Sequence, residues 1–281
     1  MSGLPVLVDG LDFGEGPRWH DDRLWFSDFF QHSVSTVDAQ GARTVELEID
    51  DQPSGLGWLP DGRLLVVAMK SRRVLRQEPD GSVVEHADLS TVATGPCNDM
   101  VVAADGTAYV GSFGFDFTIG EPVSPAVLVR VQPDGTIDIA ADGLEFPNGT
   151  VITPDGAALI VGETFGRRAT AFTVADDGSL HDRRVWAELG EVSPDGCTLD
   201  AEGAIWFADA AGTSVVRVRE GGEVADRIEV GQNTFACALG GDDGCTLFVV
   251  AAASARDEDV VGTGTGTIRT VRVDVPHAGL P

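Results

Sequence analysis

The amino-acid sequence predicts an all-β fold: a six-bladed β-propeller with four antiparallel strands per blade and a ring closed by the N-terminal strand. Three observations predict it. A turn followed by a short apolar strand recurs six times, a second series of turns lies between those copies, and no segment has a sustained helical period. The whole chain, residues 1–281, is expected to form one propeller domain.

The first series of turns marks the inner hairpin of each predicted blade. Copies such as "LPDGRLLVVA" and "DAEGAIWFAD" recur at intervals of 40 to 50 residues, a spacing typical of propeller blades. The turn residues are Asp22, Gly62, Gly106, Gly156, Gly203 and Gly244. Three positions after them stand Trp25, Leu65, Tyr109, Leu159, Trp206 and Leu247. The shared register predicts six equivalent strands.

The second series of turns predicts the outer half of each blade. Segments such as "EPDGSV", "QPDGTI" and "ADDGSL" lie between the copies of the first series. Each is flanked by Val, Ile or Arg in the alternation typical of half-exposed strands. Two turns per repeat imply four strands per repeat.

The last repeat lacks an outermost strand. It has inner strands near "FACALGG" and "TLFVVAA" and a third at "GTIRTVRVDV", after which the sequence ends. The segment "LPVLVDGL" near the N-terminus has no other partner, so we expect it to supply the missing strand. The polar, glycine-rich segment 254–266 is expected to be a mobile loop.

Charge and composition restrict the partners. A formal net charge of −26 repels phosphate backbones and anionic lipids, so neither a nucleic acid nor a membrane is expected as a partner. The sequence has no 18-residue apolar run and no signal-peptide pattern, which predicts a cytoplasmic protein. The cysteines have no zinc-site spacing and are expected to be small buried thiols. They are Cys97, Cys197, Cys237 and Cys245.

Polar residues recur at the start of the first strand of each predicted blade. Eight residues before the turn glycines stand Ser54, Asn98, Asn148, Asp195 and Ala236, and seven before Asp22 stands Glu15. The first strands of a propeller line its central channel. Equivalent positions on them are therefore expected to form a ring around the channel mouth.

Four members of this ring carry oxygen ligands. Glu15, Asn98, Asn148 and Asp195 supply two carboxylates and two amides, a set suited to Ca²⁺, Mg²⁺ or Mn²⁺. Asn and Asp are also common turn residues before strands, so each alone is weak evidence. Glu has no such turn role, and four polar residues at equivalent positions favour a metal site.

Four motifs, in this order and spacing, resemble the regucalcin and gluconolactonase family of six-bladed propellers, also called the senescence-marker-protein family. They are "GEGPRW", "CNDM", "PNGTVITPDG" and "PDGCTLDAEGAIWFAD". The resemblance covers nearly the whole chain. It implies one divalent metal ion bound by Glu15, Asn148 and Asp195, with Asn98 close to metal and substrate. It also implies lactone hydrolysis. Ca²⁺ is the first choice of metal, with Zn²⁺, Mg²⁺ or Mn²⁺ as alternatives.

The hydrolysis of a lactone needs a base that activates water. Asp195 is our candidate, by the resemblance and because a carboxylate beside both metal and substrate can reach the water. Metal ligation lowers the pKa of a carboxyl, which weakens this assignment. Asp99, next to Asn98, is a second candidate, although it can equally be a solvated or capping carboxylate.

Departures from the family pattern concern the substrate. Sugar-lactone members have an arginine two residues before the asparagine of "CNDM", where this chain has Pro96. The loop "GSFGFDFTIGEP" keeps an acidic residue, Asp116, among phenylalanines. Asp116, Phe113 and Phe115 are our substrate-binding candidates, with Phe117, Phe29 and Phe30 nearby. Phenylalanines in a propeller often only pack between blades. Their number here predicts a lactone, or related ester, less polar than a sugar lactone.

Two other functions remain open. A non-catalytic propeller that binds calcium or a ligand would use the same ring of residues. A propeller of the strictosidine-synthase kind typically lacks this metal set, so the ring counts against it. A metal position beside a pocket and a placed base would distinguish an enzyme from a binding protein. The expected partner is a small-molecule lactone or ester.

Overall fold

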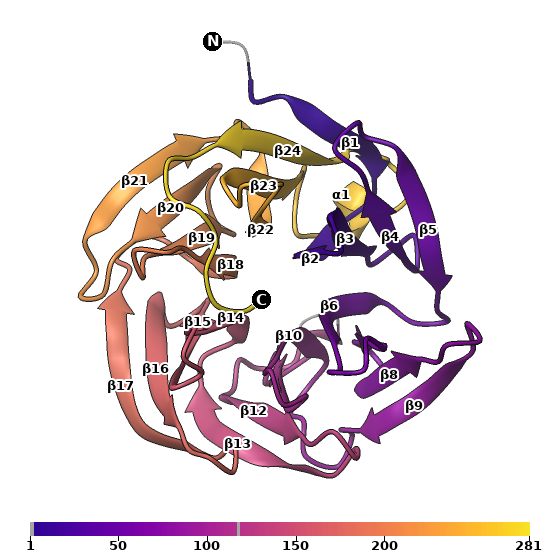
Figure 1. Ribbon diagram of the computed structural model, residues 1–281, viewed down its shortest axis with the longest axis vertical. Coiled ribbons are helices and arrows are strands. Elements are labelled where there is room, and N and C mark those ends of the chain that lie inside the picture. Colours follow the sequence, from indigo (N-terminus) through magenta and orange to yellow (C-terminus); the bar gives the residue numbers. More distant parts are fainter. Residues whose placement is uncertain (1–2, 117–118) are drawn as a thin grey trace.

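A computed structural model, which describes residues 3–116 and 119–281, has six four-stranded sheets arranged around a central axis (Figure 1). Neighbouring strands within every sheet are antiparallel. The predicted six-bladed propeller is therefore confirmed.

Each blade has four strands, from an innermost strand at the channel to an outermost strand on the rim. The innermost strands are β2 (Gly14–His20), β6 (Pro53–Trp58), β10 (Cys97–Val102), β14 (Pro147–Ile152), β18 (Pro194–Leu199) and β22 (Asn233–Gly240). The second strands are β3 (Arg23–Asp28), β7 (Leu64–Ala68), β11 (Ala108–Ser112), β15 (Ala158–Glu163), β19 (Ile205–Asp209) and β23 (Thr246–Ala252). The third strands are β4 (Ser33–Val37), β8 (Arg73–Gln77), β12 (Ala126–Val131), β16 (Arg168–Val174), β20 (Ser214–Val218) and β24 (Gly266–Arg272). The outermost strands are β5 (Arg43–Glu48), β9 (Val83–Asp88), β13 (Ile137–Leu144), β17 (Leu180–Glu188), β21 (Val224–Glu229) and β1 (Val6–Leu11).

The N-terminal strand closes the ring, as predicted. β1 pairs with β24, with Val6 opposite Arg269 and Leu11 opposite Gly266, and forms the outer edge of the last blade (Figure 1). The two ends of the chain therefore share one sheet. This arrangement hydrogen-bonds the last blade to the first part of the chain.

The burial of the strands follows their distance from the channel. All residues of β10 and β18 are buried, whereas β21 on the rim has none. Large aromatic side chains on the second strands, such as Trp206 and Tyr109, fill the spaces between sheets. The Tyr109 hydroxyl donates to the Gly178 carbonyl of the next blade at 2.7 Å. The apolar runs of the sequence thus form a core between blades.

The C-terminal segment after β24 crosses the end of the channel at which the innermost strands finish. His277 N–H donates to the Gly244 carbonyl, and Leu280 exchanges backbone hydrogen bonds with Ile152. Figure 1 places the C-terminus near the centre of the ring. This end of the channel is therefore covered by the chain itself.

The segment 254–266 differs from the expected loop. It contains a short helix, α1 (Asp257–Val260), whose Val260 is fully buried. The N–H groups of Gly262 and Gly264 donate to the Asp12 carboxylate at 2.9 and 3.0 Å. A buried apolar contact and a distant carboxylate hold this segment, and neither has a local sequence signal.

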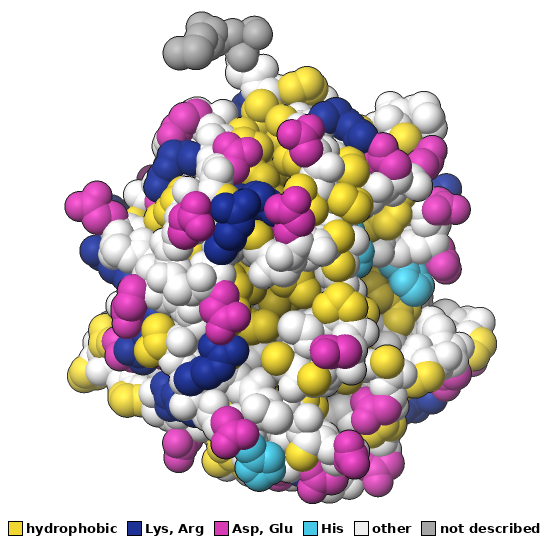
Figure 2. Space-filling model, turned by 60° about the vertical axis from the view of Figure 1, so that its left-hand side comes forward, with side chains coloured by type: hydrophobic (Ala, Val, Ile, Leu, Met, Phe, Trp, Pro, Cys, Tyr) yellow, Lys and Arg dark blue, Asp and Glu magenta, His cyan; other side chains and the backbone are white. Residues whose placement is uncertain are grey.

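Acidic side chains are scattered over the face shown in Figure 2, among basic and hydrophobic ones. This distribution agrees with the sequence charge of −26. No helix formed by the described residues is long and apolar enough to cross a membrane.

Candidate metal and substrate site

A pocket of about 610 Å³ lies at the channel end where the innermost strands begin. Glu15, Asn98, Asn148 and Asp195 all line it, so the four polar ring residues meet as the counting of repeats predicts. In the sixth blade, Phe235 lines the pocket in place of Ala236. The register shift of β22 falls between Thr234 and Ala236 and brings Phe235 to the mouth.

Backbone bulges aim the ring residues into the channel. The pairing of β18 with β19 shifts register between Pro194 and Cys197, and β14 does the same between Pro147 and Thr150. A bulge turns a side chain away from the normal alternation of a strand. Asn148 and Asp195 sit within these bulges.

Glycines allow the innermost strands to pack closely beside the ring residues. A Cβ on Gly149 would lie 2.5 Å from the Asp195 carbonyl oxygen, and one on Gly196 would lie 2.6 Å from the Ala236 Cβ. Neither contact is sterically allowed. The narrow channel therefore requires glycine at positions 149 and 196.

Hydrogen bonds orient the Asn148 amide. Its Nδ2 donates to the Thr164 hydroxyl at 3.3 Å, and that hydroxyl donates to the Pro194 carbonyl at 2.7 Å. Asn148 Oδ1 and Asp195 Oδ1 are buried and have no hydrogen-bond partner among the described residues. A buried oxygen without a partner costs about 1–3 kcal/mol. These two oxygens are thus available to a cation.

The side chains of the other two ring residues, Asn98 and Glu15, each make one hydrogen bond to the backbone. Asn98 Nδ2 donates to the Pro147 carbonyl at 3.4 Å. Glu15 Oε2 accepts from the N–H of Gly16 at 3.0 Å. Both residues are buried at the mouth of the channel, with relative exposures of 5% for Asn98 and 6% for Glu15.

Burial raises the pKa of the Glu15 carboxyl well above its ordinary value of 4.5, and the charges of Asp195 and Asp99 raise it further. The Gly16 N–H and Arg18 oppose this rise. Burial likewise raises the pKa of the Asp195 carboxyl well above 3.8, with Asp99 adding to the effect. The protein alone therefore disfavours two charged carboxylates here.

A buried ion pair lies next to the ring. Arg18 Nη2 donates to Asp99 Oδ1 at 2.5 Å and to the Met100 carbonyl at 2.8 Å. Its Nε donates to the Leu56 carbonyl at 3.2 Å, so one guanidinium joins the first three blades. Asp99 faces this guanidinium and is not among the residues that line the pocket. Its position does not favour it as the base.

Phenylalanines form the pocket walls, but not all of those expected. Phe113 and Asp116 line the pocket, as do Phe29 and Phe30. Phe115 does not: it is 5% exposed and lies behind the wall, with its ring centroid 5.9 Å from that of Phe165. The expectation that Phe115 contacts substrate is therefore not supported. Phe117 lies outside the described residues.

Some residues that line the pocket were not predicted from the sequence, among them Phe146 and Phe165. Phe146 stands two residues before Asn148, and Phe165 directly follows Thr164 after β15. Both could have been predicted, because they stand at positions that recur from blade to blade. Residues two positions before the ring, and those just after the second strands, line the pocket in several blades. They are Phe13, Gln52, Pro96 and Phe146, and then Phe29, Phe30, Met69, Lys70, Phe113, Thr164, Phe165 and Ala210.

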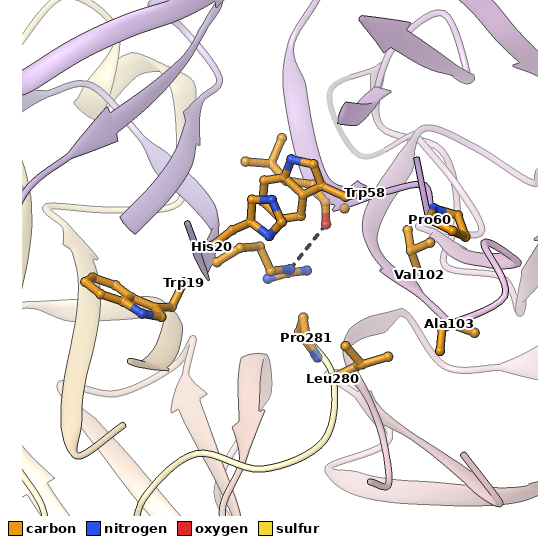
Figure 3. A pocket seen from close by; sticks show the side chains of 12 residues that line it. Trp19, His20, Trp58, Pro60, Val102, Ala103, Leu280 and Pro281 are labelled. Atoms are coloured by element: carbon orange, nitrogen blue, oxygen red, sulfur yellow. Dashed lines mark hydrogen bonds between the residues drawn. The ribbon is translucent and has the colours of Figure 1, made fainter. Parts of the chain in front are cut away.

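The opposite end of the channel contains a smaller cavity of about 280 Å³. Arg18 lines it, together with His20 and Trp58, whose rings stack at a centroid distance of 3.9 Å. Figure 3 shows Leu280 and Pro281 beside them. Since the C-terminal segment covers this end, the larger pocket is the open approach to the ring.

The cysteines lie apart from this chemistry. Cys97, Cys197 and Cys237 are buried free thiols, as expected, and none lines the pocket. Burial raises the pKa of the Cys97 thiol to about 12, which keeps it protonated. Cys245 is only partly buried, so the expectation of burial is wrong for it. It follows a surface turn at Gly244.

A family model described as the SMP-30/gluconolactonase/LRE-like region matches residues 13–253. The chain belongs to this family. The resemblance inferred from the four motifs is thereby confirmed, and the ring residues all lie within the matched region.

Relatives in this family include named lactonases. The chain is 29% identical to a pentonolactonase of Haloferax volcanii over 292 aligned positions, covering 100% of this chain and 97% of the relative. It is 24% identical to a 6-deoxy-6-sulfogluconolactonase of Pseudomonas putida, covering 95% and 94%. A calcium-binding protein named regucalcin from Agrobacterium tumefaciens shares the fold, with a TM-score of 0.83, 22% identity and coverage of 100% and 96%.

Proposed function

We propose that this protein is a hydrolase of small-molecule lactones that uses one divalent cation bound by Glu15, Asn148 and Asp195. The named lactonases among its relatives support the reaction class. The metal ion is supported by the buried charged groups at the channel, which carry more negative than positive charge when they are ionised.

The net charge of these buried groups at the channel is −2. Glu15, Asp99 and Asp195 are carboxylates with relative exposures of 6%, 4% and 6%, and Arg18 is a guanidinium at 3%. Three negative charges and one positive charge leave −2 when all four groups are ionised. A buried charge without compensation is strongly unfavourable. One divalent cation would neutralise this set.

The donor set indicates which cations fit. Among residues 3–116 and 119–281, no group of three or more His, Cys, Asp or Glu has a metal-binding arrangement, so the asparagine oxygens are needed. Carboxylate and amide oxygens favour Ca²⁺, Mg²⁺ or Mn²⁺ over Zn²⁺. We take Ca²⁺ as the first choice. The partnerless Oδ1 atoms of Asn148 and Asp195 fit such an ion.

Asp195 and Asn98 have different roles in the proposed hydrolysis of a lactone. A divalent cation at the ring supplies a Lewis acid for the lactone carbonyl. Asp195 has two carboxylate oxygens, so one can bind the cation while the other accepts a proton from the attacking water. Asn98, at the same mouth, can donate its amide hydrogens to the substrate. The pocket beside the ring favours this enzyme over a non-catalytic calcium-binding propeller.

The pocket walls favour a substrate less polar than a sugar lactone, or a related ester. Pro96 lines the pocket where a hydrogen-bonding arginine is expected for sugars. Phe113 lies next to it, and its backbone N–H donates to the Pro96 carbonyl at 2.9 Å. Asp116 lines the same pocket and retains one acidic contact. Apolar walls gain most from an apolar substrate surface.

A hydrolysis screen tests the proposal. Sugar, alkyl and aromatic lactones are offered to the protein with and without a chelator, alongside Asp195→Ala. We expect lactone hydrolysis that a chelator abolishes and that Asp195→Ala lowers by at least about a hundredfold. Activity that survives both treatments would rule out the metal mechanism. Metal binding without turnover of any lactone would instead favour the non-catalytic binding protein.

A further inference from the structure

Three phenylalanines form a continuous apolar wall next to the ring, called here the phenylalanine row: Phe113, Phe146 and Phe165. The rings of Phe113 and Phe146 stack with centroids 4.5 Å apart and an angle of 12°. The centroids of Phe146 and Phe165 are 4.8 Å apart at 33°. All three residues line the larger pocket. The row therefore presents a run of aromatic surface to a ligand.

The row is continuous with the proposed metal ligands. Phe146 precedes Asn148 by two residues, and Phe165 follows Thr164, whose hydroxyl accepts from the Asn148 amide. The backbone N–H of Thr164 donates to the Phe146 carbonyl at 3.0 Å and ties the two segments together. A group bound on the row thus lies beside the ring of oxygens.

Phe146 occupies this place at a conformational cost. Its φ is +64°, in the left-handed region that bulky residues rarely adopt. Such backbone strain concentrates at binding and catalytic sites, where surrounding contacts hold it. Glycine would adopt this conformation freely. The chain instead keeps an aromatic ring there, facing the pocket.

Phe165 is exposed although it is aromatic. Its relative exposure is 51%, while its ring remains in contact with Phe146. Phe146 and Phe165 belong to none of the apolar core clusters that the described residues form. The aromatics on the other side of the pocket differ: Phe13 and Phe235 pack in a core cluster with Val260 of α1. Packing of the fold explains Phe13 and Phe235, but not the outer part of the row.

We propose that the phenylalanine row is a subsite for a flat, aromatic substituent of the lactone substrate, with Phe146 and Phe165 as specificity-determining residues. This inference rests on the proposed lactonase function and names its substrate class. An aromatic ring packed against the row would be removed from water and would meet the ring edges of the stacked phenylalanines or the exposed surface of Phe165. The row offers no hydrogen bond to sugar hydroxyls, whose burial there would be unfavourable.

Binding of stable lactams tests the subsite independently of catalysis. The two probes are 3,4-dihydroquinolin-2-one, which carries a fused benzene ring, and 2-piperidone, which lacks it. We expect the bicyclic probe to bind at least about tenfold more tightly in calorimetric titrations, from the apolar area it buries. Equal affinities for the two probes would overturn the proposal.

Substitutions of Phe165 and Phe146 test whether these residues cause the preference for the bicyclic probe. Phe165→Ala and Phe146→Gly should each weaken the bicyclic probe about fivefold or more and change the monocyclic probe by less than about twofold. Val185→Ala on the rim strand β17 is the matched control, because Val185 is also 51% exposed, and it should change neither. Thermal unfolding confirms that each variant is folded. Equal weakening of both probes would assign the row a structural role only.

The matching lactones separate this inference from the function on which it rests. Dihydrocoumarin and δ-valerolactone differ by the same benzene ring, and kcat/KM should favour dihydrocoumarin and lose that preference in both phenylalanine variants. If neither lactone is hydrolysed but the lactams still discriminate, the lactonase proposal fails and the subsite stands. If both lactones are hydrolysed equally well, the subsite fails and the lactonase proposal stands.

Discussion

The residue that follows the ring position is a glycine in four of the six blades and differs in the other two. Gly16, Gly55, Gly149 and Gly196 follow the ring residues of four blades, where neighbouring strands approach closely. The third blade has Asp99 instead, and the sixth has Cys237 after Ala236. A Cβ on Gly55 would lie 2.9 Å from Asp99 Oδ1, so the neighbouring glycine makes room for this carboxylate. Asp99 supplies the third buried negative charge and pairs with the buried guanidinium of Arg18.

Removal of either member of the Arg18–Asp99 pair should disturb both stability and metal affinity. Arg18→Met leaves Asp99 buried without a cation, and Asp99→Asn leaves the guanidinium without its anion. Each should destabilise the protein by about 3–5 kcal/mol in urea unfolding. In calcium titrations, Asp99→Asn should weaken binding about tenfold or more and Arg18→Met should not weaken it, because the net buried charge becomes −1 or −3.

The double variant is the control for this prediction. Arg18→Met with Asp99→Asn restores a net charge of −2 from Glu15 and Asp195 alone, so calcium affinity should return towards that of the unmodified protein. A loss of calcium affinity in both single variants, with a still larger loss in the double variant, would contradict this charge balance.

At the scale of elements, the repeats were predictable and the exceptions were not. Turn spacing predicts the hairpins and the closing strand β1, because each blade repeats the same short-range signals. The segment 254–266 has no such signal: α1 is four residues long, and its neighbouring glycines bind Asp12, about 250 positions away. The position of Phe146, two residues before the ring, could have been inferred from the repeats, but its positive φ could not, because that conformation depends on the tertiary surroundings.

Asp12 should control the order of α1 and the adjoining pocket wall. Asp12→Ala removes the acceptor of the Gly262 and Gly264 N–H groups, while its own N–H can still donate to Asp28. We expect several-fold faster tryptic cleavage after Arg256, which lines the pocket. Asp9→Ala, on the exposed face of β1, is the control and should leave the cleavage rate unchanged. Equal rates in all three proteins would show that Asp12 does not hold the segment.

At the scale of the whole molecule, the propeller brings residues from distant repeats to one axis. Glu15, Asn98, Asn148 and Asp195 come from four blades, and repeat counting alone predicted their meeting. It could not predict that the Oδ1 atoms of Asn148 and Asp195 would lack hydrogen-bond partners in the described part of the chain, or that Arg18 would compensate only one of three carboxylates. Those properties arise from the packing of side chains between blades.

Metal removal should make stability depend on pH. The pKa values of Glu15 and Asp195 are raised above 4.5 and 3.8 by burial, so the metal-free folded state binds protons more tightly than the unfolded state. Its stability is then greatest below those ordinary values and falls as pH rises through the raised pKa values. We expect the Tm of the chelated protein to fall as pH rises above the range in which carboxyl groups ordinarily titrate.

Bound Ca²⁺ should reduce that fall, because the cation favours the ionised carboxylates in the folded state. The double variant Glu15→Gln with Asp195→Asn should have little pH dependence over the same rise in pH, with or without Ca²⁺. The same slope of Tm against pH in chelated and Ca²⁺-loaded protein would argue against a metal at these residues.

The rate of lactone hydrolysis as Ca²⁺ is added back to chelator-treated protein tests the proposed metal mechanism. We expect almost no hydrolysis without the cation and a rate that saturates with one cation bound per chain. A full rate in the presence of chelator, unchanged by added Ca²⁺, would contradict it.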